Sequence, residues 1–111
     1  MAQTTPIVLD NQLYLTKGAQ PLCTLESPTW FDWLHSATTF RYCSRQRRYI
    51  IRGYGPFLAP ISLRKEKRRR GVLWYAYRRS FRTLHKRYVG KSEALTSARL
   101  EEVTRLLNEV D

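Results

Sequence analysis

The sequence predicts a small α+β domain, with a three-stranded or larger antiparallel sheet, an N-terminal helix and a C-terminal helix packed on one face of the sheet. Three observations predict this class. Apolar residues recur at helical spacing at about 28–37 and again at about 97–109, and they alternate along about 61–89. The length of 111 residues fits one domain with one modest core.

The N-terminal part of the chain is weakly patterned. Residues 12–16 alternate and can form a short strand, and turn-forming residues follow at Gly18 and Pro21. We therefore divide the chain into residues 1–26, an N-terminal arm or short strand, and residues 27–111, a single basic α+β domain.

The first helix has a clear start signal. Ser27 suits the N-cap because its hydroxyl accepts an amide hydrogen bond, and Pro28 suits the next position, where no amide donor is needed. An apolar stripe follows at Trp30, Phe31, Trp33 and Leu34. Two tryptophans can stack on bases, but a domain this small needs them for packing, so we expect them in the core.

The middle of the chain has the period of strands. We expect short strands at 40–43 and 49–52, then a loop at 53–60, where Gly and Pro gather. A three-stranded antiparallel meander follows, with strands at 61–67, 72–79 and 84–89.

The turns and the last helix have their own signals. The turn at 68–71 ends in Gly71, where a positive φ is expected, and a second turn lies at 80–83. Thr96 is a plausible N-cap for an amphipathic helix at 97–109, whose apolar residues recur at intervals of three and four.

The positive charge is concentrated in the middle of the chain. The whole chain carries a formal net charge of +11, and residues 41–91 alone carry 17 basic residues and one acid, Glu66, for a net charge of +16. Thirteen of those 17 are Arg, which pairs with phosphates bidentately and stacks on bases. Such a segment attracts polyanions, so it favours nucleic acid over an acidic protein, a membrane surface or a merely solvated face.

Basic and aromatic residues alternate along the predicted meander. Trp74, Ala76 and Arg78 would lie on one face of the central strand, and Leu73, Tyr75, Tyr77 and Arg79 on the other. Alternation does not say which face the helix covers. We expect Tyr75, Tyr77 and Tyr88 to belong to the core. The candidate nucleic-acid-binding residues are Arg64, Lys65, Lys67, Arg68, Arg69, Arg70, Trp74, Arg78, Arg79, Arg82, Lys86 and Arg87.

Several motifs occur here in a recognisable order. They are Leu63-Arg64-Lys65-Glu66, Arg69-Arg70-Gly71, Trp74-Tyr75-Ala76-Tyr77-Arg78-Arg79, Lys86-Arg87-Tyr88-Val89-Gly90-Lys91-Ser92, Leu95-Thr96 and Arg99-Leu100-Glu101. Together with Trp30 to Leu34 and Phe40, they resemble a segment that precedes the ATPase region of some bacterial LuxR/MalT-type transcriptional regulators. The resemblance covers about residues 27–107. It implies a bacterial protein and a connection with transcription regulation, but it assigns no activity to the segment itself.

A second resemblance concerns shape alone. Three antiparallel strands followed by one helix are similar to the arm-type DNA-binding domains of phage integrases and to plant ethylene-response-factor domains. In those domains the sheet enters the major groove, which implies DNA binding by fold analogy only.

Enzyme and metal hypotheses have weaker support. Gly71-Val72-Leu73 and Tyr88-Val89-Gly90 resemble the two motifs of GIY-YIG nucleases, but Leu73 stands where that family has Tyr. The spacings of Cys23, His35, Cys43 and His85 match no compact zinc site. We therefore expect no catalytic residues, no metal and no cofactor.

The cysteine count and the hydropathy suggest a location. Two cysteines do not make a disulfide framework, and no apolar run approaches the roughly 20 residues of a membrane span. We expect a cytoplasmic protein without membrane contact, associated with the nucleoid if it is bacterial.

These patterns predict a non-catalytic nucleic-acid-binding protein, with duplex DNA preferred over RNA, that regulates transcription or a mobile element. Arg69→Ala and Arg78→Ala should each weaken binding and lower its salt dependence by about one unit of slope. The alternative is a protein-interaction module that docks an acidic partner or forms a homodimer, because the net charge of residues 92–111 is −3.

Overall fold

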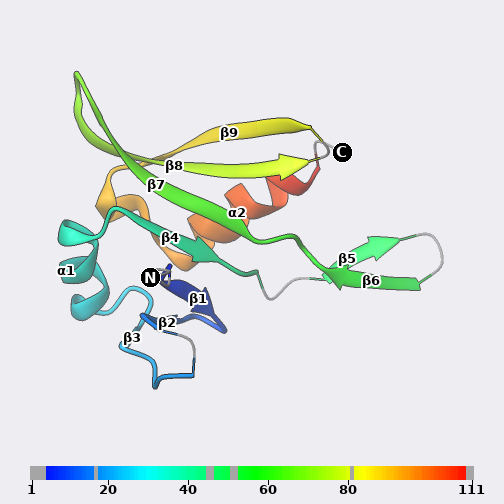
Figure 1. Cartoon of the computed structure of the whole chain (residues 1–111), viewed down its shortest axis with the longest axis horizontal. Helices are drawn as coiled ribbons and strands as arrows, with labels where there is room; N and C mark the ends of the chain where they lie inside the picture. The colour runs from blue at the N-terminus through cyan, green and yellow to red at the C-terminus, as the bar shows by residue number, and fades with distance from the viewer. Residues whose placement is uncertain (1–4, 17, 45–46, 51–52, 81, 110–111) are drawn as a thin grey trace.

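The structure, a computed structural model, describes residues 5–16, 18–44, 47–50, 53–80 and 82–109. Within these residues the chain is α+β, with a seven-stranded sheet, a two-stranded hairpin and two α-helices (Figure 1). The α+β class is therefore confirmed.

The sheet is larger than the predicted meander, and it is mixed. Its strand order is β3-β2-β1-β4-β7-β8-β9. The strands are β1 (Ile7–Leu9), β2 (Gln12–Tyr14), β3 (Cys23–Thr24), β4 (Thr39–Tyr42), β7 (Ile61–Arg68), β8 (Gly71–Ser80) and β9 (Thr83–Gly90). All neighbouring strands are antiparallel except β1 and β4, which are parallel. The prediction of a purely antiparallel sheet is corrected on this point.

The N-terminal residues are part of this sheet. Residues 7–24 supply β1, β2 and β3. Of the two predicted alternatives for the N-terminal segment, an arm or a short strand, these residues therefore form strands. Asp10 and Asn11 connect β1 to β2 with φ of 53° and 65°. Two successive positive φ values are typical of a two-residue hairpin turn, and Asp and Asn tolerate them.

Both predicted α-helices are present with their predicted caps. Helix α1 (Pro28–Ser36) has Ser27 at its N-cap, and the Ser27 hydroxyl accepts a hydrogen bond from the Trp30 amide at 3.3 Å. Helix α2 (Ser97–Asn108) has Thr96 in the same role, with the Arg99 amide as donor at 3.2 Å. A short 3-10 helix, η1 (Ser92–Ala94), connects β9 to α2.

The C-terminal meander is confirmed as β7, β8 and β9. Its first turn ends in Gly71, whose φ of 112° matches the expected positive value. Between residues 47 and 57 the outcome differs. Where a strand was predicted at 49–52, the structure has β5 (Arg47–Ile50), and positions 51–52 lie outside the described residues. Where a loop was predicted at 53–60, the first part forms β6 (Gly53–Phe57). In a two-stranded hairpin both strands are edge strands, where Gly and Pro are tolerated.

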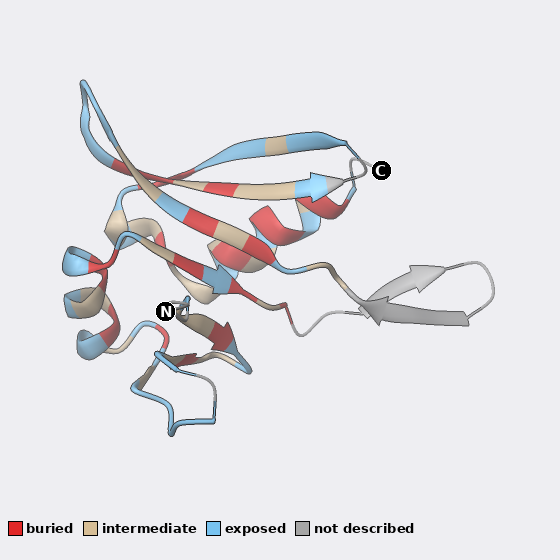
Figure 2. Ribbon diagram, in the orientation of Figure 1, coloured by how far each residue is buried: buried red, intermediate tan, exposed pale blue. Residues whose placement is uncertain are grey.

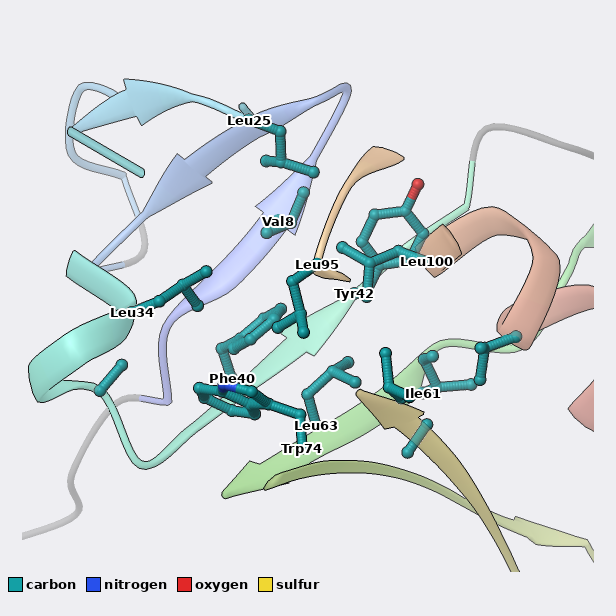
Figure 3. Close-up of a cluster of buried hydrophobic side chains, with 14 of the residues drawn as sticks. Val8, Leu25, Leu34, Phe40, Tyr42, Ile61, Leu63, Trp74, Leu95 and Leu100 are labelled. Atoms are coloured by element: carbon teal, nitrogen blue, oxygen red, sulfur yellow. The ribbon is translucent and has the colours of Figure 1, made fainter. Parts of the chain in front are cut away.

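The helices cover one face of the sheet. Helix α2 packs on β8 and β9, and the ring of Trp30 from α1 meets Phe40 of β4 edge-on at 5.4 Å. Phe40 in turn meets Trp74 of β8 at 5.4 Å, so both helices share one core on the same side (Figure 3). Trp30 and Leu34 are fully buried there, as expected, whereas Phe31 and Trp33 are partly buried against the core.

Gly90 is required at the end of β9. Its φ is 141°, and a Cβ there would lie 2.7 Å from the Cβ of Ala94 in η1. We expect Gly90→Ala to lower the free energy of unfolding by about 3 kcal/mol, because a strained backbone is combined with a clash. Gly71→Ala is the matched control, since its φ is also positive but nothing lies within 4 Å of the added Cβ. Its cost should be about 1 kcal/mol. Urea unfolding of both variants measures the difference, and equal stabilities would contradict this account.

Candidate nucleic-acid interface

The alternation of buried residues along β8 shows which face of the sheet the helices leave uncovered. Trp74 and Ala76 are fully buried on the helix side, so the alternating residues Tyr75 and Tyr77 point to the opposite side. Their cross-strand partners share that side. We call the following set the open face: Ser62, Arg64, Glu66, Arg68, Leu73, Tyr75, Tyr77, Arg79, Leu84, Lys86 and Tyr88.

No helix of the described chain lies on the open face, and the outer part of the meander is largely exposed (Figure 2). Tyr75 and Tyr77 are half-buried, and Tyr88 is 48% exposed. The expectation that these three tyrosines belong to the core is therefore wrong. The reason is that tryptophan, phenylalanine and aliphatic side chains fill the core on the helix side, which leaves the tyrosines the other face.

The tyrosines of the open face are interleaved with cations. The ammonium of Lys86 lies 4.4 Å from the ring centre of Tyr75 and 5.5 Å from that of Tyr77. The guanidinium of Arg68 lies 5.3 Å from the Tyr75 ring, and that of Arg64 lies 5.8 Å from the Tyr77 ring. Cation–π contacts of this kind hold long basic side chains against the sheet and keep their charges at its surface.

Glu66 is the one acid of residues 41–91, and it lies among these cations. The Tyr77 hydroxyl donates a hydrogen bond to its carboxylate, Arg68 pairs with it, and the Lys86 ammonium lies 3.2 Å from Oε1. The Tyr77 hydrogen bond, followed by Lys86 and Arg68, lowers the pKa of Glu66. The carboxylate therefore stays ionised even in mildly acidic solution.

Glu66→Gln should strengthen binding of a polyanion. The change removes one negative charge from the open face and releases Lys86 and Arg68 from their ion pairs, so we expect the affinity for DNA to rise about three- to tenfold at low salt. Fluorescence anisotropy measures this. Glu109→Gln at the end of α2, whose carboxylate pairs with Arg105, is the control and should change the affinity little. Weaker binding by the folded Glu66→Gln variant would mean that the carboxylate organises the face rather than opposing the ligand.

A concavity of about 580 Å³ lies where β7 turns into β8. We call it the turn concavity, and it is lined by Arg68, Arg69, Arg70, Leu73, Tyr75, Tyr88 and Lys91. Arg69 and Arg70 are exposed and belong to the turn between β7 and β8, which lies at the upper left end of the sheet in Figure 1. The lining contains four cations, two tyrosines and no acid.

Three of the candidate residues lie on the helix side and are held there by hydrogen bonds to other parts of the fold. Trp74 has no exposed surface and donates its indole N–H to Ser92 Oγ at 3.0 Å, so it is a core residue that presents nothing to a ligand. Lys65 donates to the carbonyls of Leu34 and His35 at 2.5 and 3.1 Å, at the C-terminal end of α1, and burial lowers the pKa of Lys65.

Arg78 has the same role for α2, since it donates to the Leu107 carbonyl at 3.1 Å. Helix C-termini carry partial negative charge and unpaired carbonyls, which attract cations. Lys65 and Arg78 therefore support the fold, and Arg78→Ala is no longer expected to report on binding.

The other candidates fall into four groups. Arg64, Arg68, Arg79 and Lys86 lie on the open face, and Arg69 and Arg70 lie in the turn beside it. Arg82 is exposed in the β8–β9 turn. Lys67 and Arg87 are exposed but alternate to the helix side of their strands, opposite Val72 and Ala76.

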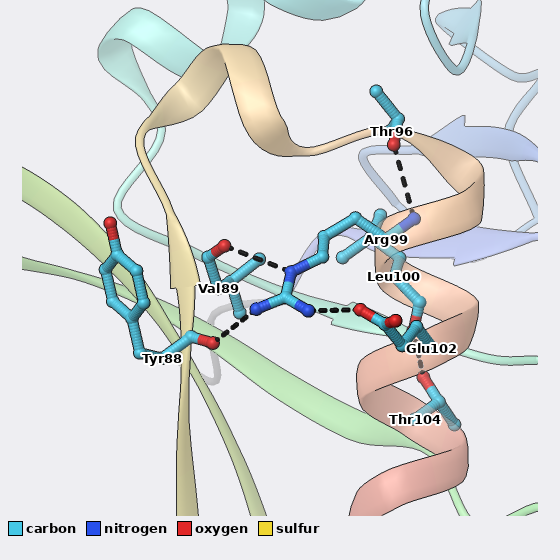
Figure 4. Close-up of polar contacts among 7 residues, drawn as sticks. All are labelled: Tyr88, Val89, Thr96, Arg99, Leu100, Glu102 and Thr104. Atoms are coloured by element: carbon cyan, nitrogen blue, oxygen red, sulfur yellow. Dashed lines mark hydrogen bonds and ion pairs between the residues drawn. The ribbon is translucent and has the colours of Figure 1, made fainter.

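Sequence analysis missed two contributors, Tyr88 as an exposed ring and Arg99 as its support. The Arg99 guanidinium donates to the Tyr88 carbonyl at 2.9 Å and to the Val89 carbonyl at 3.2 Å, and it pairs with Glu102 (Figure 4). Arg99 thus ties the end of β9 to α2 and fixes the backbone from which the Tyr88 ring projects. The spacing of Tyr88 two residues after Lys86 was the available signal, since it places both on one face.

Metal and membrane features were searched for as well. Among the residues that the structure describes, no group of three or more His, Cys, Asp and Glu side chains could hold a metal ion. The described helices include none that is long and apolar enough to span a bilayer. Cys23 and Cys43 are free thiols, and burial raises the pKa of both.

Comparison with known proteins gave no match to any family model, to any curated protein or to any solved structure. The function is therefore inferred from the geometry of the open face.

Proposed function

We propose that this protein is a non-catalytic nucleic-acid-binding protein whose open face binds duplex DNA in preference to RNA. The observation that carries the proposal is the concentration of Arg, Lys and Tyr on a sheet face that no described helix covers. The pattern of burial supports the proposal further, because the buried apolar side chains of the core lie on the opposite face of the sheet.

The geometry favours a sheet-in-groove mode. Strands lie about 4.8 Å apart, so the three strands β7, β8 and β9 span about 10 Å, which fits a major groove about 12 Å wide. Cations on both flanks of such a ribbon meet the two phosphate backbones, and the release of counterions supplies affinity. The central tyrosines would then face base edges. The shape expected from the sequence, three antiparallel strands followed by a helix, resembles integrase arm-type domains, and this resemblance motivates the mode.

The wider role follows from the ligand and from the sequence resemblance. A DNA-binding domain of this kind would act in regulating transcription or a mobile element, in the cytoplasm and at the nucleoid if the protein is bacterial. The rival proposal, docking of an acidic protein or of a second copy, uses the same charges and is an outcome of the experiment below.

The experiment is fluorescence anisotropy with labelled duplex DNA, single-stranded DNA and duplex RNA across a salt series, with an acidic peptide as control. We expect tightest binding to duplex DNA, a steep decrease of affinity with salt, and a preference that persists at physiological salt. Equal binding of all polyanions, lost at physiological salt, would contradict the proposal. Preference for the acidic peptide would favour the protein-docking rival.

A further inference from the structure

The turn concavity has the chemistry of a nucleotide site. Its volume of about 580 Å³ is within the range of small-molecule pockets. Arg69, Arg70 and Lys91 bring three cations to its rim without a carboxylate in the lining. Two smaller cavities of about 290 Å³ contain neither Arg nor Lys in their linings. The turn concavity therefore combines space with phosphate-binding groups.

The two tyrosines of this concavity differ in what already contacts them. Tyr75 has Arg68 and Lys86 over its ring. Tyr88 meets Tyr75 edge-on, with ring centres 5.6 Å apart, and among the described residues no cation lies over the Tyr88 ring. The Tyr88 side of the pair therefore has room for a flat ligand. The Arg99 guanidinium donates a hydrogen bond to the Tyr88 carbonyl, so the backbone that carries the ring is fixed near the end of β9.

We propose that the turn concavity binds one unpaired nucleotide of the nucleic-acid ligand, with the base stacked on Tyr88 and a neighbouring phosphate held by Arg69, Arg70 and Lys91. This inference rests on the proposed function. A base inside a duplex has both faces covered by its neighbours, so only a base from an overhang, a bulge or a single strand can stack on Tyr88. The remainder of the open face binds the adjoining duplex.

The test compares a blunt duplex with the same duplex carrying a short single-stranded overhang. We expect the wild-type protein to bind the overhang DNA about tenfold more tightly, in keeping with the stacking of one base on an aromatic ring. Tyr88→Leu should bind blunt and overhang DNA with equal affinity, whereas Tyr88→Phe should keep the preference for the overhang.

Two controls separate stacking from charge. An overhang that lacks its bases but keeps its phosphates should lose most of the preference and keep only the smaller, salt-dependent part that its phosphates supply. Arg79→Ala, at the far end of the open face from the concavity, should weaken binding of both duplexes by the same factor.

The binding results that would overturn the nucleotide site differ from those that would overturn the proposed function. Equal wild-type affinity for blunt and overhang DNA overturns the nucleotide site and leaves the proposed function intact. So does an overhang preference that persists undiminished in the folded Tyr88→Leu variant or with the baseless overhang. Absence of binding to either duplex overturns the proposed function itself.

Discussion

Replacing Arg68, Arg69 and Arg70 together by Ala is expected to weaken binding of duplex DNA about 100-fold at roughly 0.1 M salt. All three line the turn concavity, and Arg69 and Arg70 are exposed in the turn between β7 and β8. Each phosphate contact that is lost releases about one counterion fewer, so the slope of log affinity against log salt should fall by about three. Anisotropy titrations at several salt concentrations measure both quantities.

Arg105→Ala is the control for a general effect of charge. Arg105 is exposed on α2, on the helix side of the sheet, and pairs with Glu109 at 2.8 Å. Its loss should leave DNA affinity within about twofold of the wild type, since exposed charges more than a Debye length from the ligand are screened. If the triple variant keeps the full salt slope while folding normally, the turn is not part of the interface.

Trp30→Ala should cause the largest loss of stability, about 3–5 kcal/mol in the free energy of unfolding. Trp30 is fully buried and stacks near Trp33 at 5.7 Å, and it meets Phe40 edge-on. Its indole N–H donates to the Leu95 carbonyl at 2.9 Å, which joins α1 to the segment between η1 and α2. A domain with a typical stability of about 5–15 kcal/mol would lose a large share of it.

Trp30→Phe separates the hydrogen bond from the packing. The phenyl ring fills most of the space, but the buried Leu95 carbonyl loses its donor, so we expect a cost of about 1–3 kcal/mol. Chemical denaturation followed by circular dichroism measures both variants. Equal costs for Ala and Phe would show that the hydrogen bond dominates, contrary to this account.

Local signals predicted the helices and the meander well. Ser27 and Thr96 cap their helices as expected because capping depends on residues only three apart. Among the strands that were missed, β1 depends on a partner far away in the chain. β1 has three residues, and it joins the sheet by pairing in parallel with β4, across α1. The alternation along residues 12–16 was a local clue to β2, and the Asp10-Asn11 turn was a further one to β1.

The residue types of the candidate interface could be predicted from the sequence, but the face of the sheet on which each residue lies could not. A period of two divides β8 into two sets, and only the packing of α1 and α2 decides which set is buried. For this reason Trp74, Lys65 and Arg78 could not be separated from Arg64, Arg68 and Lys86 by sequence. The tyrosines were misplaced for the same reason, because their amphipathic rings suit either face.

The most direct test of the central claim is an NMR titration of the labelled protein with a short duplex DNA, with amide shifts followed residue by residue. We expect the largest changes in β7, β8 and β9 at Arg64, Tyr75, Tyr77 and Tyr88 and in the turn at Arg69 and Arg70, and small changes at Arg105 and elsewhere on α2. Changes concentrated on α2, with the open face unaffected, would contradict the claim that the uncovered sheet face binds nucleic acid.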